Sequence, residues 1–152
     1  MRIFGAIGTA GWLLFTASSA WAACAPGVTG GAMLEIQMEG VRSNKGQLTV
    51  TVYPDDPSRF LASGGKEARV RVPVSQPMTE ACLEVPKPGT YAIAVYHDEN
   101  MDRKFNRTFV GLPDEGYGFS RNPTGLLGIP GFDEVKFAAV AGVNRLTIKI
   151  TY

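Results

Sequence analysis

One stretch of the chain combines acidic and amide side chains at a spacing that could bind a cation. Directly after a strongly apolar segment, Asp98, Asn100 and Asp102 occupy alternate positions. In calcium loops of the EF-hand type, positions 1, 3 and 5 supply side-chain oxygens, position 7 a backbone carbonyl and position 9 a further ligand. Counted from Asp98, positions 7 and 9 are Lys104 and Asn106. This stretch therefore predicts an oxygen-ligand loop for calcium, the one cofactor that we expect.

Two positions depart from that template. Position 6, where glycine makes the sharp turn, is Arg103, and position 12, where a bidentate carboxylate closes the shell, is Phe109. Asp114 or Glu115 could fold back to supply the missing carboxylate. Alternatively, the aspartates and asparagines serve only as Asx-turns, in which a side-chain oxygen accepts hydrogen bonds from nearby backbone. One histidine and two distant cysteines form no recognisable zinc or copper set.

His97 is the only histidine and directly precedes this loop. It continues one face of the apolar strand before it, so its ring is expected at the rim of a sheet. There it either bonds to loop backbone or acts as a general base beside Asp98 and Glu115. No nucleophile motif accompanies it, and Ser120 is an unsupported candidate. We expect a structural histidine in a non-enzymatic protein, with a small hydrolase or isomerase as the alternative.

A glycine-rich segment from Gly111 to Phe132 follows the loop. It holds six glycines and three prolines without periodicity, and loops of this length are usually functional or disordered. Its apolar side chains are too many for disorder: Tyr117, Phe119, Leu126, Leu127, Ile129 and Phe132. We expect a compact flap over the end of the fold, which either covers a sheet edge or walls a ligand site. The surface residues predicted for that site are His97, Tyr117, Phe119 and Ser120.

Strands must position these loops, because apolar and polar residues alternate along most of the chain. Strands are expected at 34–38, 48–52, 70–74, 81–85, 91–96, 135–139 and 146–150, with a helical turn at 56–61. Asn44-Lys45-Gly46 predicts a hairpin turn between the first two strands, and Asn144 a turn before the last. Pro73 predicts an edge strand, whereas the two-sided apolar segment 91–96 predicts a central one. The expected fold is a single antiparallel β-sandwich of about seven strands, immunoglobulin-like or transthyretin-like.

The first 22 residues have the pattern of a signal peptide. Arg2 precedes an apolar segment, residues 3–17, and Ala20-Trp21-Ala22 matches a small-x-small cleavage pattern. We therefore expect an exported protein, periplasmic or extracellular, with one domain over residues 23–152. Ala22-Ala23-Cys24 also resembles the end of a lipoprotein box, so a lipidated Cys24 is an alternative.

Charge and cysteine content narrow the classes of partner. The chain has 15 basic and 14 acidic residues, and without Arg2 the numbers are equal. This balance differs from the basic footprint of nucleic-acid binders and from a polybasic membrane patch, and no segment after residue 22 predicts a membrane span. Export favours a disulfide between Cys24 and Cys82, with a lipidated Cys24 or two free thiols as alternatives. A small ligand, or a protein bound along a sheet edge, is the expected partner.

Several motifs resemble those of a bacterial family, domain of unknown function 2141. The segment from His97 is similar to H-D-x-N-x-N-G-x-x-D, and residues 111–120 are similar to G-x-P-x-E-G-Y/F-G-F-S. Gly128-Ile129-Pro130-Gly131-Phe132 is similar to a third motif, G-x-P-x-F. The aligned residues are His97, Asp98, Asn100, Asp102, Glu115, Tyr117, Gly118, Phe119 and Ser120. The resemblance covers most of the chain after residue 22 and implies an exported β protein without an established activity. Arg103 replaces the glycine of the pattern and Asn106 its aspartate, which argues against tight cation binding.

Overall fold

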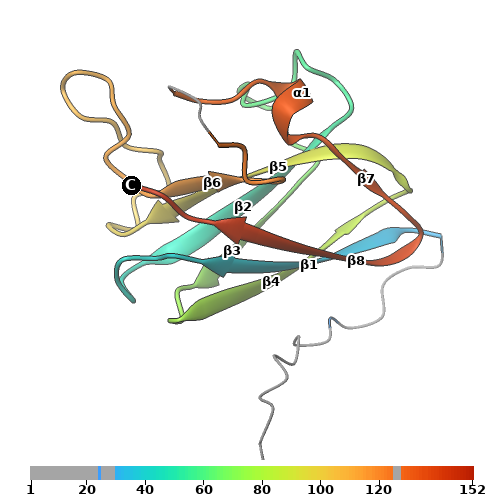
Figure 1. Ribbon diagram of the computed structural model, residues 1–152, viewed down its shortest axis with the longest axis horizontal. Coiled ribbons are helices and arrows are strands. Elements are labelled where there is room, and N and C mark those ends of the chain that lie inside the picture. Colours follow the sequence, from blue (N-terminus) through green and yellow to red (C-terminus); the bar gives the residue numbers. More distant parts are fainter. Residues whose placement is uncertain (1–23, 25–29, 125–127) are drawn as a thin grey trace, which may run out of the picture.

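Two β-sheets packed face to face make up the computed structural model, which describes residues 24, 30–124 and 128–152 (Figure 1). The elements are β1 (Ala32–Glu39), β2 (Gln47–Pro54), β3 (Ala68–Pro73), β4 (Met78–Val85), β5 (Gly89–Asp98), β6 (Tyr117–Phe119), α1 (Phe132–Val135), β7 (Phe137–Ala139) and β8 (Gly142–Lys149). One sheet has the order β4-β1-β8 and the other β3-β2-β5-β6, with β7 also paired to β5. The predicted signal peptide, Leu126 and Leu127 lie outside the described residues. Within these ranges, no helix combines the length and apolarity that crossing a membrane requires.

The core lies between the two sheets, where alternate residues of the central strands face inward. Leu34, Ile36, Val50, Val52 and Ile93 are all 1% exposed or less. Full burial of such a side chain contributes about 2 kcal/mol, so this inner face drives the association of the sheets. The predicted all-β sandwich is therefore confirmed. Pro73 does end an edge strand, and β5 lies in the middle of its sheet, as predicted.

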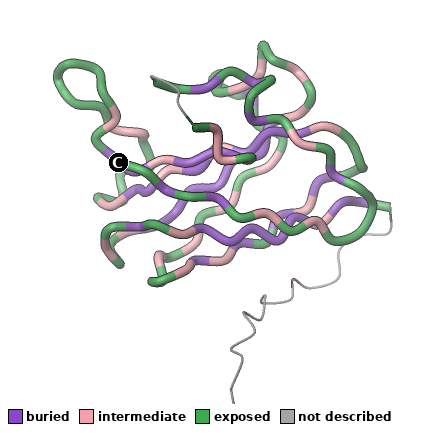
Figure 2. The backbone as a smooth tube through the Cα atoms, viewed as in Figure 1, coloured by how far each residue is buried: buried purple, intermediate pink, exposed green. Residues whose placement is uncertain are grey.

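A second apolar cluster covers the outer face of the larger sheet. Tyr53, Ala92, Phe119 and residues of α1 are buried in it, and Phe60 packs against them. In Figure 1, α1 and the segment before it lie over this face, and Figure 2 shows the buried backbone beneath them. The predicted flap thus exists in part, but it also contributes β6, a strand that we did not predict.

Residues 40–46 connect the two sheets, so the predicted hairpin is wrong. β1 pairs with β4 and β8, whereas β2 pairs with β3 and β5. Gly46 has φ +68°, and a Cβ atom there would lie 2.0 Å from the carbonyl oxygen of Asp98. The glycine is thus required where this connection crosses the end of β5. Alternation predicted both strands, but it carries no information on which sheet each strand joins.

Four smaller expectations also need correction. β8 runs parallel to β1, which is an exception to the antiparallel arrangement. Asn144 lies within β8, and the chain turns before it, between β7 and β8. The side-chain nitrogen of Asn144 donates to the carbonyl of Val140 in this turn. Val135 belongs to α1 and not to a strand, because residues 132–135 cover the outer apolar cluster. The segment at 56–61 forms turns and no helix, with Asp56 accepting a hydrogen bond from the backbone of Ser58.

Cys24 and Cys82 form the favoured disulfide. Their Cα atoms are 5.7 Å apart, and 58 positions separate them in the sequence. The bridge ties the start of the described chain to β4, beside β1. It is the first of the three alternatives considered for these cysteines.

Candidate cation site

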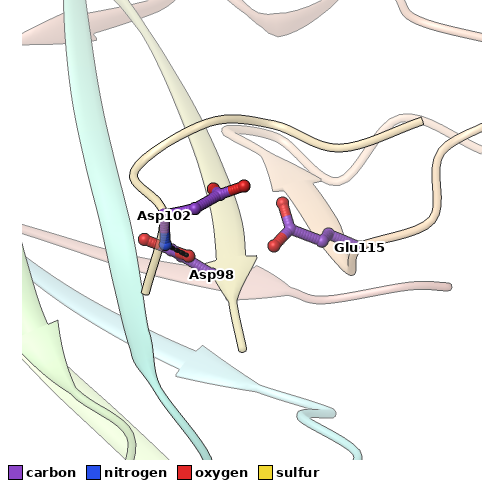
Figure 3. Close-up of side chains that lie close together, drawn as sticks. All are labelled: Asp98, Asp102 and Glu115. Carbon is purple, nitrogen blue, oxygen red and sulfur yellow. Dashed lines mark hydrogen bonds between the residues drawn. The ribbon is translucent and has the colours of Figure 1, made fainter. Parts of the chain in front are cut away.

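Three carboxylates meet at the end of β5 (Figure 3). Asp98 ends β5, Asp102 lies in the following loop and Glu115 lies just before β6. One oxygen from each lies within 4.8 Å of those of the other two. The strand register explains the meeting, because Tyr96 pairs with Tyr117 in the antiparallel β5–β6 pair. Continued by two residues, this register places Asp98 opposite Glu115.

Asp98 is completely buried and accepts hydrogen bonds on both oxygens. Its Oδ2 accepts from the Gln47 side chain at 2.8 Å and from the Arg103 amide at 3.0 Å. Its Oδ1 accepts from the Asp102 amide, also at 3.0 Å. These bonds hold the loop against the sheet. Gln47 was not predicted for this site, because its pairing with Asp98 depends on the contact between β2 and β5.

The predicted Asx-turns are present in the loop. Asn100 Oδ1 accepts from the Asp102 amide at 3.0 Å, and Asp102 Oδ1 accepts from the Lys104 amide at 2.8 Å. The side-chain nitrogens of Asn100 and Asn106 both donate to Asp102 Oδ2. Two predicted amide ligands therefore direct NH₂ groups toward the cluster. The hydrogen bond from the Lys104 amide, and after it the bond from Asn106, lowers the pKa of Asp102.

Glu115 differs from the two aspartates because one of its oxygens is unsatisfied. The residue is 5% exposed. Its Oε2 accepts from the Asn106 amide at 3.0 Å, whereas its buried Oε1 has no hydrogen-bond partner among the described residues. Burial raises the pKa of Glu115, and the Asp98 and Asp102 charges raise it further. A buried oxygen without a donor is costly, so this atom is the one most in need of a ligand.

Arg103 stands where the calcium-loop template has a glycine for its sharp turn, and its backbone is left-handed. Its φ angle is +63°, as is that of Met101. Left-handed backbone costs a residue with a Cβ atom about 1 kcal/mol or more. The sharp turn thus forms without glycine, and the Arg103 amide still reaches Asp98. The departure from the template costs stability but leaves the carboxylates together.

His97 is fully buried on the inner face of β5, and both ring nitrogens have partners. Nε2 lies 2.7 Å from the carbonyl oxygen of Lys45, and Nδ1 lies 2.6 Å from the hydroxyl of Tyr152. Since a carbonyl only accepts, Nε2 carries a proton and donates it, and in the neutral ring Nδ1 accepts from Tyr152. His97 thus bonds to loop backbone, but to the connection between β1 and β2 and not to the loop that follows it, and its ring is buried and not at the rim of the sheet. This arrangement leaves neither nitrogen available as a general base.

An ion pair next to His97 was not predicted. The Arg42 guanidinium contacts Glu99, whose other oxygen accepts from the Ser43 hydroxyl at 2.6 Å. The hydrogen bond from Arg42 lowers the pKa of Glu99 to about 2. Arg42 also lies over the Tyr152 ring, 4.4 Å from its centre. No local motif indicated this group, because Arg42 and Glu99 are 57 positions apart.

The residues predicted for a flap surface are mostly buried. Phe119 is 7% exposed and Ser120 is fully buried, whereas Tyr117 is half-buried. The Ser120 hydroxyl accepts from the Ile93 amide at 2.9 Å and donates to the Val135 carbonyl. It therefore joins β5 to α1 and is not exposed as a nucleophile. These residues are covered because β6 extends the sheet.

A groove of about 300 Å³ lies beside the carboxylates, on the outer face of the larger sheet. Aromatic rings form much of its wall, and Phe105 packs 5.9 Å from Tyr96 and 6.1 Å from Tyr117. Three arginines also line it, while none of its lining residues is acidic: Arg69, Arg103 and Arg107. No carboxylate of the described residues forms an ion pair with these arginines. The groove thus combines flat apolar surface with unpaired positive charge.

Comparison with known proteins assigns the family. The family described as "Uncharacterized protein conserved in bacteria", domain of unknown function 2141, matches residues 36–147. No curated protein and no solved structure matches the chain. The matched range includes the loop, the three carboxylates and β6. The chain therefore belongs to the bacterial domain of unknown function 2141 family.

Proposed function

We propose that this protein is an exported, non-enzymatic β-sandwich module that binds calcium through Asp98, Asp102 and Glu115. The ion stabilises the loop that joins β5 to β6. The observation that carries this proposal is the buried Oε1 of Glu115, which lacks a donor and lies beside two other carboxylates. A hard cation supplies the charge that this arrangement lacks.

The charge balance of the site supports a divalent ion. Three carboxylates with oxygens inside 4.8 Å repel one another, and burial of two of them reduces screening by water. Calcium takes six to eight oxygens in a flexible geometry, so water and loop carbonyls complete its shell. Asn106 contributes if its amide turns its oxygen inward. Arg103 and Lys104 are exposed, so solvent screens their repulsion.

Thermal unfolding with calcium and with chelator tests this proposal. At a calcium concentration about ten times the dissociation constant, the melting temperature should rise by about 4 °C, because calcium binds only the folded state. Glu115→Gln keeps an acceptor for Asn106 but removes the charge, so it should abolish the shift. Asp114→Asn is the matched control, since Asp114 is exposed, adjacent to Glu115 and outside the cluster. An unchanged melting curve at millimolar calcium, or an equal shift in Glu115→Gln, would contradict the proposal.

A second candidate function is binding of a small anionic ligand in the groove. The observation in its favour is the set of three unpaired arginines around exposed parts of aromatic rings. Arg69 is held in place because its Nε donates to the Thr51 hydroxyl at 2.8 Å. A planar ring bearing a carboxylate would stack on Phe105 and pair with a guanidinium.

Titration with benzoate tests this second function, with benzyl alcohol as the uncharged comparison. We expect benzoate to bind and benzyl alcohol to bind at least tenfold more weakly. Arg69→Gln should weaken benzoate binding several-fold, whereas Arg71→Gln should not, since Arg71 lies on the same strand outside the groove. Equal binding of both compounds, or equal effects of both variants, would exclude a charge-selective site.

A further inference from the structure

The loop between β5 and β6 ends in a narrow projecting turn with an apolar tip. In Figure 1 this segment, residues 107–113, extends away from both sheets, and Figure 2 shows it exposed. Phe109 is 106% exposed, Val110 75% and Leu112 62%. No other exposed large apolar residue among the described ones exceeds 61%. The three most exposed large apolar side chains of the described residues thus lie together on this one turn.

The turn is well ordered by its own hydrogen bonds. The Gly111 amide donates to the Thr108 carbonyl at 2.8 Å, and the Thr108 amide donates to the Leu112 carbonyl at 2.7 Å. Gly111 has φ +83°. This is a three-residue hairpin loop, a β-turn followed by a left-handed glycine. Phe109 and Val110 occupy the two central turn positions, where polar residues, glycine or proline are usual, so turn formation does not account for them.

Basic residues precede this apolar tip in the loop. Arg103, Lys104 and Arg107 are exposed, and the exposed acidic residues of the same stretch are Asp102 and Asp114, so the exposed charges of residues 102–114 sum to +1. Arg107 is fixed toward the turn because its side chain donates to the Gly111 carbonyl at 3.0 Å. Among the described residues no ion pair neutralises these three side chains. An apolar tip with Arg107 at its base, on a loop with a small excess of exposed positive charge, is complementary to a surface with a negative layer over an apolar interior.

We propose that this turn inserts its tip, Phe109, Val110 and Leu112, into the interface of a bilayer that contains anionic lipid. The bilayer fits better than a protein partner. Three side chains offer on the order of 400 Å², about half of the roughly 800 Å² that each partner buries in a stable protein interface. A convex projection also penetrates a fluid interface without needing a preformed pocket. The inference does not depend on a bound cation.

Vesicle co-sedimentation tests the proposal, with the chain from residue 23, which contains every strand of the described residues, α1 and the disulfide. The apolar segment 3–17 is excluded because it would bind lipid by itself. In chelator, the protein should sediment with phosphatidylglycerol-containing vesicles at least tenfold better than with pure phosphatidylcholine. The double variant Phe109→Ser/Val110→Ser should lose at least tenfold in binding. Val140→Ser is the matched control, because Val140 is 61% exposed at a different turn and its replacement should change nothing.

A spectroscopic measurement covers the case in which the serine variant unfolds. Residues 23–152 contain no tryptophan, so Phe109→Trp places a single emitter at the tip. Its emission should shift to shorter wavelength with anionic vesicles, and lipids brominated on their chains should quench it. Absence of sedimentation, or an unshifted spectrum with lipid, would overturn the proposal. So would concentration-dependent self-association that Phe109→Ser/Val110→Ser abolishes, since the tip would then be a protein contact.

Discussion

Two consecutive residues at the end of β5 send polar side chains to opposite faces of the sheet. His97 faces the core, where a carbonyl and a hydroxyl satisfy both of its nitrogens. Asp98 faces outward, toward Glu115, whose Oε1 is buried without a partner. His97 and Glu115 are similarly buried. Both ring nitrogens of His97 have hydrogen-bond partners, whereas one carboxylate oxygen of Glu115 has none. The satisfied side therefore serves folding, whereas the unsatisfied side is where a ligand would add the missing interaction.

The largest expected effect comes from breaking the satisfied side. His97→Ala leaves the Lys45 carbonyl without its donor, removes the acceptor of the Tyr152 hydroxyl and creates a cavity, so it should lower the free energy of unfolding by about 3 kcal/mol. Urea denaturation measures this loss. Tyr152→Phe keeps the bond from His97 to Lys45 but removes the bond to His97 and the bond from the Arg42 amide, and it should cost about 2 kcal/mol. A loss below 1 kcal/mol in His97→Ala would mean that the satisfied pair is not a structural element.

The unsatisfied side should respond in the opposite direction. In chelator, Glu115→Gln should raise the free energy of unfolding by about 1.5 kcal/mol, because it removes a buried charge, one oxygen of which has no partner, beside two carboxylates. Its new NH₂ group can also donate to Asp98 or Asp102. The same urea experiment measures it, with Asp114→Asn as the control expected to change little. Destabilisation by Glu115→Gln in chelator would show that the carboxylate is already satisfied.

The turn of the loop offers a smaller change in the same direction. Arg103→Gly removes the cost of φ +63° and should stabilise the protein by about 1 kcal/mol, reduced somewhat by the greater freedom of glycine in the unfolded chain. Lys104→Gly is the matched control, since Lys104 does not have a positive φ, and it should destabilise by a similar amount. Thermal unfolding compares the two. Equal effects would rule out backbone strain at Arg103.

The smallest effect concerns the ion pair next to His97. The folded-state pKa of Glu99 is about 2 against an ordinary value of 4.5. A lowered pKa means that this stabilisation is complete above pH 4.5 and is lost as the pH falls through about 2. Half-exposed Arg42 is screened by solvent, so the contribution should stay below about 1 kcal/mol. Unfolding measured from pH 5 to pH 2 should show a shallower decline in Glu99→Gln than in the native chain.

The strands were largely predictable, but their partners were not. Apolar and polar residues alternate along β1 and β2 because only the apolar face of each packs on the core between the sheets, although most residues of both faces are buried. This alternation is visible in the sequence. The pairing of β1 with β8, 110 residues away, leaves no local pattern. β6 was missed because Gly118 interrupts a very short alternation. That glycine is needed because a Cβ atom there would lie 2.4 Å from the Lys149 carbonyl.

The candidate site was predictable to a similar extent. Asp98, Asp102 and Glu115 were recognised as possible ligands from residue type and spacing alone. Asn100 and Asn106 were expected to offer oxygens, whereas their amide nitrogens face Asp102. Orientation of an amide depends on the donors around it, and these become known only when the loop is folded.

The sequence alone determined which residues could bear oxygen ligands, which segments could alternate into strands and which family motifs the chain carries. Only the tertiary structure decided that His97 is satisfied and that Glu115 is not. The physical reason is that a buried polar atom is satisfied by groups distant in sequence, here Lys45 and Tyr152 for His97 and Gln47 for Asp98. Their approach follows from sheet pairing and from the crossing at Gly46, and neither is written in the local pattern.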